Sequence, residues 1–198
     1  LFRSKALKKT SKPVIRKVIN KMMKIMGEQF VMSEDIKSAV KRAHKTKVEG
    51  YCYSYDMLGE GARTEQIAED YFDSYLMAIE EIGKANKTSK RNTLDGISIK
   101  LSALHSRYEL NQYEKVYDVL YDRLKKLVYK AKEFDLQVNI DAEEVARLDL
   151  SLCLFKRLCQ DPDFADYSNL GLAVQAYQKR AFYVLDFLLN MAKKTNKK

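Results

Sequence analysis

The chain has 198 residues, 46% of them hydrophobic, with few Gly (7) and Pro (2), so it can form one domain with a substantial core and is neither collagenous nor low-complexity. The three cysteines do not have metal-ligand spacing, so we expect no metal site. No apolar run approaches the ~18 residues of a membrane span, and the N-terminus lacks a secretory pattern. We therefore expect a cytoplasmic protein. The net charge of +9 is concentrated at the two ends, and residues 25–192 hold 23 basic and 27 acidic residues, which argues against a nucleic-acid-binding body.

The first 47 residues are expected to form a basic helical lead-in region. Apolar periodicity predicts two helices, at about residues 14–26 and 34–46. Residues 1–24 hold nine Lys or Arg and no acidic residue. Such an end is typical of a solvated helix face. The alternative is a basic amphipathic contact with nucleic acid or with a membrane surface, which would make the protein peripheral to the inner membrane.

Four short segments predict β-strands, and each is followed by a segment with helical periodicity. The strands are Tyr51–Asp56, Ile97–Leu101, Leu136–Asp141 and Leu172–Ala176. Four strand–helix repeats are typical of a parallel sheet with right-handed crossovers. The two candidate folds are therefore a doubly wound sheet and a (β/α) barrel.

The helices between the strands have recognisable start and stop signals. The first is expected to begin at the N-cap Thr64 and to end at Gly83. Asn111 is a candidate cap for the second helix, and the third is expected to run from about Glu144 to Cys159. A fourth apolar stripe, from Ala181 to Leu189, follows the last strand.

The alternation of side chains along the strands favours the barrel. In the second strand, for example, Ile97 and Ile99 share one face and Ser98 and Lys100 the other. A doubly wound sheet buries both faces, so its strands should be continuous apolar runs. In a barrel, the apolar face meets the helices and the polar face points into the interior. We therefore expect an α/β fold of the (β/α)-barrel type, with helices on the convex side only.

A polar residue lies at or near the carboxyl end of each strand, where barrels and open α/β sheets build their active sites. These residues are Asp56, Lys100, Asp141 and Gln175. One cation between two carboxylates can receive a zwitterion such as an amino acid, with Lys100 on the carboxylate and an Asp facing the amine. The alternative is a structural set of charges that neutralise one another. We favour a binding site, with all four side chains converging on one concavity.

The same segments resemble the proline dehydrogenase domain of the bifunctional proline-utilisation flavoproteins. The resemblance covers nearly all of the chain, and four ordered motifs make it specific. It implies a distorted (β/α) barrel with FAD at its carboxyl-terminal face and hydride transfer from L-proline to the flavin, giving pyrroline-5-carboxylate. The matching stretches are Tyr53–Glu60, Gly96–Tyr108, Asn139–Leu152 and Gly171–Arg180, and Pro13–Val31 resembles the helical region before that barrel.

The resemblance also implies roles for individual residues. Lys100 is similar to the lysine that binds the substrate carboxylate, and Asp56 to the aspartate that lines the proline pocket. Asp141 matches the catalytic aspartate beside the flavin. Ala142 matches the adjacent flavin-contacting position, and Gln175 the glutamine that hydrogen-bonds the flavin ring. Such contacts tune the electronics and position of a flavin.

The sequence departs from the family pattern in its extent. A full barrel has eight strands and typically ~250 residues, whereas four strand–helix units are found here. The family's fifth-strand arginine motif and its final helix with paired arginines are not found. We therefore expect a truncated form: residues 1–47 as the lead-in, 48–192 as the first half of the barrel, and 193–198 as a Lys-rich tail.

The truncated form affects the enzymatic activity that we expect. We expect the chain alone to be inactive on proline and to bind FAD weakly or not at all. The alternative functions are a non-enzymatic remnant or assembly module, which self-associates or pairs with a complementing barrel half, and a basic-ended membrane or nucleic-acid binder. The two unpaired sheet edges of a four-strand sheet would favour assembly.

Overall fold

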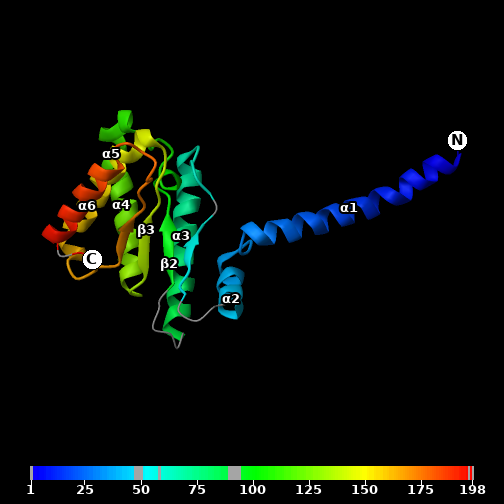
Figure 1. Cartoon of the computed structure of the whole chain (residues 1–198), viewed down its shortest axis with the longest axis horizontal. Coiled ribbons are helices and arrows are strands. Elements are labelled where there is room, and N and C mark those ends of the chain that lie inside the picture. Colours follow the sequence, from blue (N-terminus) through cyan, green and yellow to red (C-terminus); the bar gives the residue numbers. More distant parts are fainter. Residues whose placement is uncertain (1, 47–50, 58, 89–94, 196, 198) are drawn as a thin grey trace. The chain divides into compact units, whose positions relative to one another are not determined.

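The computed structural model describes residues 2–46, 51–57, 59–88, 95–195 and 197, and the chain divides into two units, Leu1–Lys47 and Val48–Lys198 (Figure 1). The boundary expected at residues 47 and 48 lies outside the described residues, as do Asn196 and Lys198 of the expected tail. Among the described residues, no helix has both the length and the apolar character needed to cross a membrane.

The first unit contains two helices, α1 (Phe2–Phe30) and α2 (Ile36–Thr46). The prediction for α2 is close, and Asp35 caps it by accepting a hydrogen bond from the Ser38 N–H at 2.9 Å. The prediction for α1 was too short. Residues 2–13 have no apolar stripe, but seven of these twelve residues are Lys, Arg, Ala or Leu, which have high helix propensity.

The second unit contains four parallel strands in the order β1-β2-β3-β4, which confirms the predicted parallel sheet. The ladder pairs Tyr55 with Ile97, Ile97 with Val138, and Ile140 with Leu172. The strands are β1 (Ser54–Asp56), β2 (Gly96–Ile99), β3 (Gln137–Ile140) and β4 (Leu170–Leu172).

The fourth strand was predicted too far along the chain. β4 ends at Leu172, whereas the prediction placed it at 172–176. The Ala173 N–H still donates to the Ile140 carbonyl at 2.9 Å. Because β3 ends at Ile140, no strand residue in the described part of the chain pairs with the segment from Val174 onward. The alternating apolar pattern of residues 172–176 therefore continues beyond the part that can pair.

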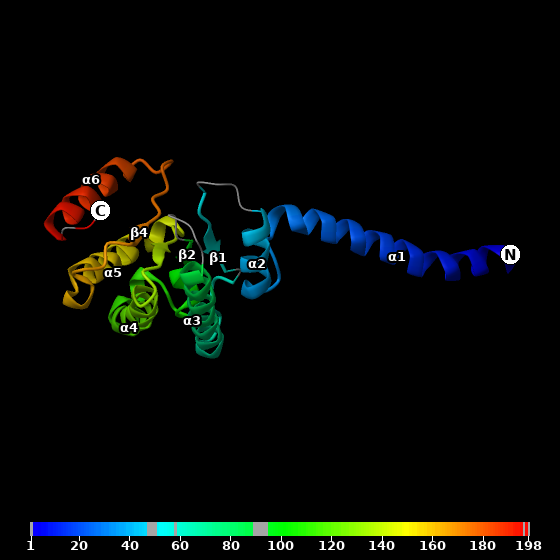
Figure 2. The same ribbon diagram turned by 90° about the horizontal axis from the view of Figure 1, so that it is seen from below.

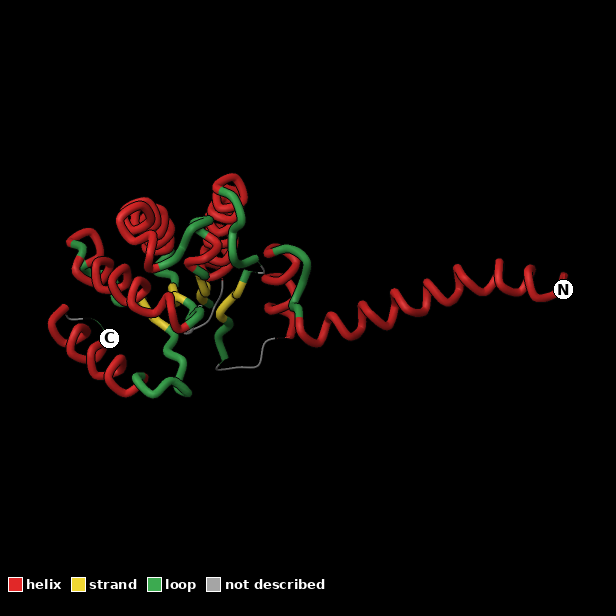
Figure 3. Tube along the Cα trace, turned by 90° about the horizontal axis from the view of Figure 1, so that it is seen from above, coloured by secondary structure: helices red, strands yellow, loops and turns green. Residues whose placement is uncertain are grey.

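The helices of the second unit form a row beside the sheet. Figures 2 and 3, seen from opposite sides, show α3, α4 and α5 along one face of the strands, with α6 next to α5 at the end of the row. The helices are α3 (Glu65–Thr88), α4 (Tyr113–Lys132), α5 (Leu148–Gln160) and α6 (Ala181–Thr195).

The core lies between these helices and the apolar face of the sheet. Ile97, Ile99, Val138 and Ile140 are fully buried. On the opposite face Ser54 and Asp56 are exposed, although Ser98 is buried. The predicted division into one apolar and one polar face therefore holds for most of the strand residues. The polar face carries the side chains that form the candidate site.

Two helix boundaries differ from the prediction. Thr64 caps α3 as expected, because its hydroxyl accepts from the Ile67 N–H at 3.2 Å. Gly83, however, does not end α3; it lies inside the helix, where an added Cβ would be 2.3 Å from Cγ of Phe134. Asn111 does not cap α4 either, since it lies in a short 3-10 helix, Leu110–Gln112, that precedes it.

The other two helices also differ at their ends. The third helix was predicted to start at about Glu144. A 3-10 helix, Val145–Arg147, occupies this position, and α5 begins after it, at Leu148. α6 includes Lys193 and Lys194 of the expected tail. The Lys197 Nζ atom donates to the Tyr167 carbonyl at 2.8 Å.

Candidate functional site

Lys100 directly follows β2, and its backbone is held by the helix behind the sheet. The Lys100 N–H donates to the Tyr75 hydroxyl of α3 at 3.1 Å. Tyr75 is only 2% exposed. Its burial raises the pKa of the phenol to about 12, so the hydroxyl is neutral. This hydrogen bond fixes the backbone from which the Lys100 side chain extends.

The Lys100 ammonium lies between two carboxylates from the neighbouring strands. Its Nζ atom is 2.5 Å from Oδ1 of Asp56, the last residue of β1, and 3.0 Å from Oδ2 of Asp141, which follows β3. The Lys100 side chain is 14% exposed, against 50% for Asp56 and 31% for Asp141. The predicted convergence of these three residues is present in the structure. The cluster is open to solvent on its carboxylate side.

Opposing effects act on the pKa of Lys100. Burial on its own lowers this pKa, but the hydrogen bonds and charges of Asp56 and Asp141 raise it by more, so the net shift is upward. The ammonium therefore stays charged at physiological pH. An ammonium has three N–H donors, and the two carboxylates use two of them. The third has no acceptor among the residues that the structure describes, so it is available to a ligand.

Asp141 is placed by the sheet ladder. Its N–H donates to the Ile99 carbonyl at 2.9 Å, which continues the pairing of β3 with β2 by one residue. Its Oδ1 accepts from the Ala142 N–H at 3.1 Å, while Oδ2 faces Lys100. The carboxylate is therefore held by its own loop on one side and by the cation on the other.

Glu143 braces the site and was missed in the sequence. Its Oε1 accepts from the Ser102 N–H at 2.9 Å, and its Oε2 pairs with Arg147 at 2.9 Å. It is 10% exposed. The brace joins the loop after Lys100 to the loop after Asp141. The spacing is the one available signal, because Ser102 and Glu143 each lie two positions beyond a site residue.

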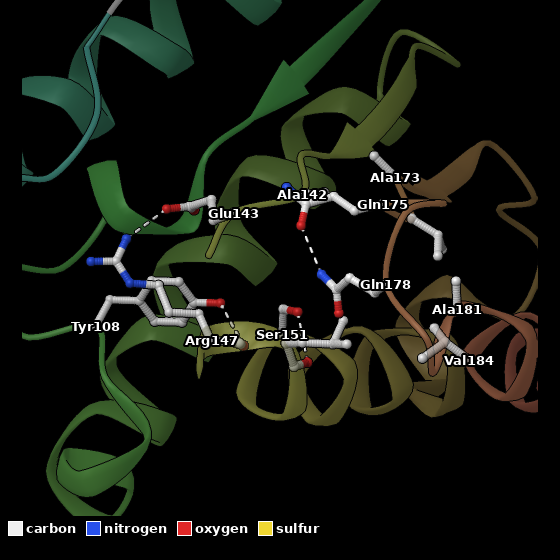
Figure 4. A pocket seen from close by; sticks show the side chains of 12 residues that line it. Tyr108, Ala142, Glu143, Arg147, Ser151, Ala173, Gln175, Gln178, Ala181 and Val184 are labelled. Carbon is white, nitrogen blue, oxygen red and sulfur yellow. Dashed lines mark hydrogen bonds and ion pairs between the residues drawn. The ribbon is translucent and has the colours of Figure 1, made fainter. Parts of the chain in front are cut away.

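Gln175 does not join the Lys100 cluster. Its Oε1 accepts hydrogen bonds from Gln178 Nε2 at 2.7 Å and from the Tyr177 hydroxyl at 3.1 Å. It lies in a pocket between the loops that follow β3 and β4, which we call the Gln175 pocket (Figure 4). Ala142 lines the same pocket. Because β4 ends three residues before Gln175, this side chain extends from a loop, and its convergence with the three charged residues on one concavity stays a prediction.

The Gln175 pocket has both polar and apolar walls. Figure 4 shows the Gln178 carboxamide directed toward Gln175, and the Arg147–Glu143 pair at the opposite end. The lining residues are Tyr108, Ala142, Glu143, Arg147, Leu148, Ser151, Ala173, Val174, Gln175, Gln178, Ala181 and Val184.

Comparison with known proteins assigns this arrangement to a family. Residues 39–198 match the family described as proline dehydrogenase. The chain belongs to the proline dehydrogenase family. The Lys100 cluster and the Gln175 pocket both lie within the matched residues.

The relatives that this chain matches are longer than the chain itself. The chain is 46% identical over 190 residues to the bifunctional protein PutA of Klebsiella aerogenes, covering 96% of this chain and 14% of PutA. Proline dehydrogenase 1 of Bacillus subtilis is 26% identical over 170 residues, covering 83% of this chain and 50% of that protein. The chain therefore spans about one seventh of the PutA protein and half of the shorter relative.

Solved structures of the family share the fold. Proline utilization A from Bdellovibrio bacteriovorus, inactivated by N-propargylglycine, matches with a TM-score of 0.83 at 25% identity, covering 93% of this chain and 20% of that one. A structure of the Bradyrhizobium japonicum protein matches with a TM-score of 0.78 at 41% identity, covering 97% and 20%.

Proposed function

We propose that this chain carries the proline-binding side of an FAD-dependent proline dehydrogenase site, which oxidises L-proline to pyrroline-5-carboxylate. The observation that carries the proposal is the Lys100 ammonium held between Asp56 and Asp141 at the carboxyl end of three adjacent parallel strands. Membership of the proline dehydrogenase family supports the reaction class. The half-barrel form of the fold is part of the same proposal.

The charge pattern of the cluster suits a zwitterion. Two carboxylates and one ammonium give a net charge of −1, so the amine of proline meets an attractive field. The free donor on Lys100 binds the proline carboxylate in a charge-assisted hydrogen bond. Asp56 or Asp141 then faces the ring nitrogen. We assign substrate binding to Lys100 and Asp56 and a catalytic contact to Asp141.

The Gln175 pocket fits a flavin in its donor chemistry. The Gln175 Oε1 atom is engaged by two donors, while its Nε2 atom makes no hydrogen bond with the described part of the chain. A free amide donor beside the small Ala142 side chain suits a planar ring that carries acceptor atoms. We assign cofactor contacts to Asp141, Ala142 and Gln175. When bound, FAD would supply the acceptor for the hydride removed from proline.

The assignment of the substrate is tested with three ring compounds. Wild-type chain is titrated, by ligand-observed NMR, with L-proline, with pyrrolidine, which lacks the carboxylate, and with cyclopentanecarboxylate, which lacks the amine. We expect proline to bind most tightly, because only proline satisfies both Lys100 and an aspartate. Equal affinity for all three compounds, or no saturable binding of proline, would contradict the assignment.

A further inference from the structure

The loop between β4 and α6 carries a second carboxamide, Gln178, which the family resemblance does not assign. The Gln178 N–H donates to the Gln175 carbonyl at 3.3 Å, and the Ala181 N–H donates to the Gln178 carbonyl at 2.9 Å. In such consecutive turns, residues three apart lie above one another. The backbone therefore places the Gln175 and Gln178 side chains on the same side of the loop.

The two side chains form one hydrogen-bonded unit. Gln178 Nε2 donates to Gln175 Oε1 at 2.7 Å (Figure 4). The Tyr177 hydroxyl donates to the same oxygen at 3.1 Å. A carboxamide has a donor end and an acceptor end, so engaging the oxygen determines where the nitrogen points. Gln178 thus sets the direction of the Gln175 N–H donors.

The surroundings of Gln178 would suit an apolar side chain better than a carboxamide, apart from its hydrogen bond to Gln175. Its own Oε1 atom is buried and accepts no hydrogen bond from the described residues. Leu148, Ala181 and Val184 line the same pocket. A buried carbonyl without a donor is unfavourable, and an apolar side chain would fill this space more stably. The contact that distinguishes Gln178 from an apolar filler is the hydrogen bond to Gln175, which low-dielectric surroundings strengthen.

The loop is also anchored beyond the pair. Arg180 Nη1 pairs with Asp149 at 3.1 Å, and its Nη2 donates to the Val145 carbonyl at 3.0 Å. These contacts tie the loop after β4 to the segment that leads into α5. Gln178 is therefore held between two fixed points, the Arg180 anchor and the end of β4.

We propose that Gln178 is a positioning residue that holds the Gln175 carboxamide with its N–H donors toward the cofactor. The proposal rests on the cofactor role given to Gln175 above. The structural part, the direction of the Gln175 amide, can be tested without any cofactor.

The test reverses the polarity of residue 178. In Gln178→Glu the new carboxylate can only accept, so the Gln175 amide should turn and donate its own N–H to it. The side-chain amide protons of Gln175 are followed by ¹H–¹⁵N NMR in the full chain, with Gln175→Leu identifying the signal. We expect slower solvent exchange of these protons in the Glu variant than in wild type. Unchanged exchange in a folded variant would overturn the proposal.

Two further variants keep this test decisive. In Gln178→Leu the new side chain fills the pocket but has no donor, so the Gln175 amide should change between orientations and its NMR signals should be averaged. If the Glu variant does not fold, the Leu variant decides, and unchanged Gln175 signals in it would overturn the proposal. Gln160→Glu adds the same charge at an exposed position at the end of α5 and should change nothing. A change of the Gln175 signals in this control would also overturn the proposal.

Flavin binding separates the positioning role of Gln178 from the cofactor role of Gln175. FAD affinity is measured by flavin fluorescence in wild type, Gln175→Leu and Gln178→Glu. We expect each variant to weaken binding roughly fivefold or more, the effect of one lost hydrogen bond. If Gln175→Leu binds FAD as wild type does, the cofactor role of Gln175 fails while the amide measurement still stands. If Gln175→Leu weakens binding and Gln178→Glu does not, the positioning role fails.

Discussion

Glu65 holds the loop after β2 against the first turn of α3. Its Oε1 accepts from the Ser106 N–H at 3.1 Å, and its Oε2 pairs with Arg123 at 3.0 Å. Burial on its own raises the pKa of Glu65, but the hydrogen bonds from Ser106 and Arg123 lower it by more, to about 2. The folded-state pKa lies below the ordinary value of 4.5. The carboxylate therefore stabilises the fold above pH ~4.5, and this contribution is lost as the pH falls toward about 2.

Replacing this carboxylate should change how stability depends on pH. We expect Glu65→Gln to lower the free energy of unfolding at neutral pH, with the difference from wild type shrinking between pH ~4.5 and about 2. The effect should be modest, because the side chain is 48% exposed. Urea denaturation at a series of pH values measures it. Glu69→Gln, whose pair with Arg123 is 3.6 Å long, is the control. A difference for Glu65→Gln that does not vary with pH would contradict the account.

Sequence reasoning was most successful for residues fixed by the strands. Asp56, Lys100 and Asp141 converge because parallel strands end at one edge and side chains alternate. Glu143 was missed, and the strand predicted to contain Gln175 ends before it, because both residues lie in loops. Glu143 is placed by a hydrogen bond from Ser102, which is far away in the chain, and Gln175 by hydrogen bonds within its own loop. The two-residue alternation of side chains along a strand predicts neither arrangement.

At the scale of elements, Gly83 shows tertiary packing overriding a local signal. A glycine after an apolar stripe is typical of a helix end, yet α3 continues to Thr88. The reason is space, because Phe134 packs where a side chain at residue 83 would be. The shift of β4 has a similar origin: its length is set by where β3 ends, and the alternation of its own residues does not show this.

Gly83→Ala should therefore destabilise the protein, although alanine is the better helix former. An added Cβ would lie 2.3 Å from Phe134 Cγ. We expect a loss of about 1–3 kcal/mol, the usual range for overpacking, measured by urea denaturation. Phe134→Ala in the same chain should remove most of this additional loss, since it removes the clash.

Gly27 of α1 is the matched control. Nothing lies within 4 Å of a Cβ built there, so Gly27→Ala should increase the helicity of α1. The difference in helix propensity between Gly and Ala is up to about 1 kcal/mol. Circular dichroism at 222 nm measures this. A Gly83→Ala variant as stable as wild type would show that Phe134 moves aside easily, and that packing does not explain the glycine.

At the scale of the whole molecule, we expect the openness of the site to limit what these 198 residues can do alone. Asp56 is half exposed, and water weakens every charge interaction in such a site. Among the described residues β4 pairs only with β3, and α6 exposes Phe182, Tyr183 and Leu189. This free edge and apolar surface favour association with another chain. Assembly would also shield the site.

We therefore expect negligible proline oxidation by the chain alone. The measurement is a dye-coupled assay on purified protein with added FAD, beside Lys100→Ala. Robust turnover by the wild-type chain that disappears in the variant would contradict this expectation. It would mean that the chain builds a complete site, and sedimentation at several concentrations would show whether it does so as an oligomer.

The central claim is that the Lys100 ammonium receives the carboxylate of proline, and the most direct measurement is the affinity of L-proline for Lys100→Met. NMR titration of the variant is compared with wild type and with Lys84→Met, which removes an exposed lysine of α3 and changes the net charge equally. Loss of a hydrogen bond to a charged group costs about 1.5–3 kcal/mol, so we expect proline affinity to fall by a factor of ten or more in Lys100→Met. Lys84→Met should bind proline as wild type does. Wild-type affinity in Lys100→Met would contradict the claim.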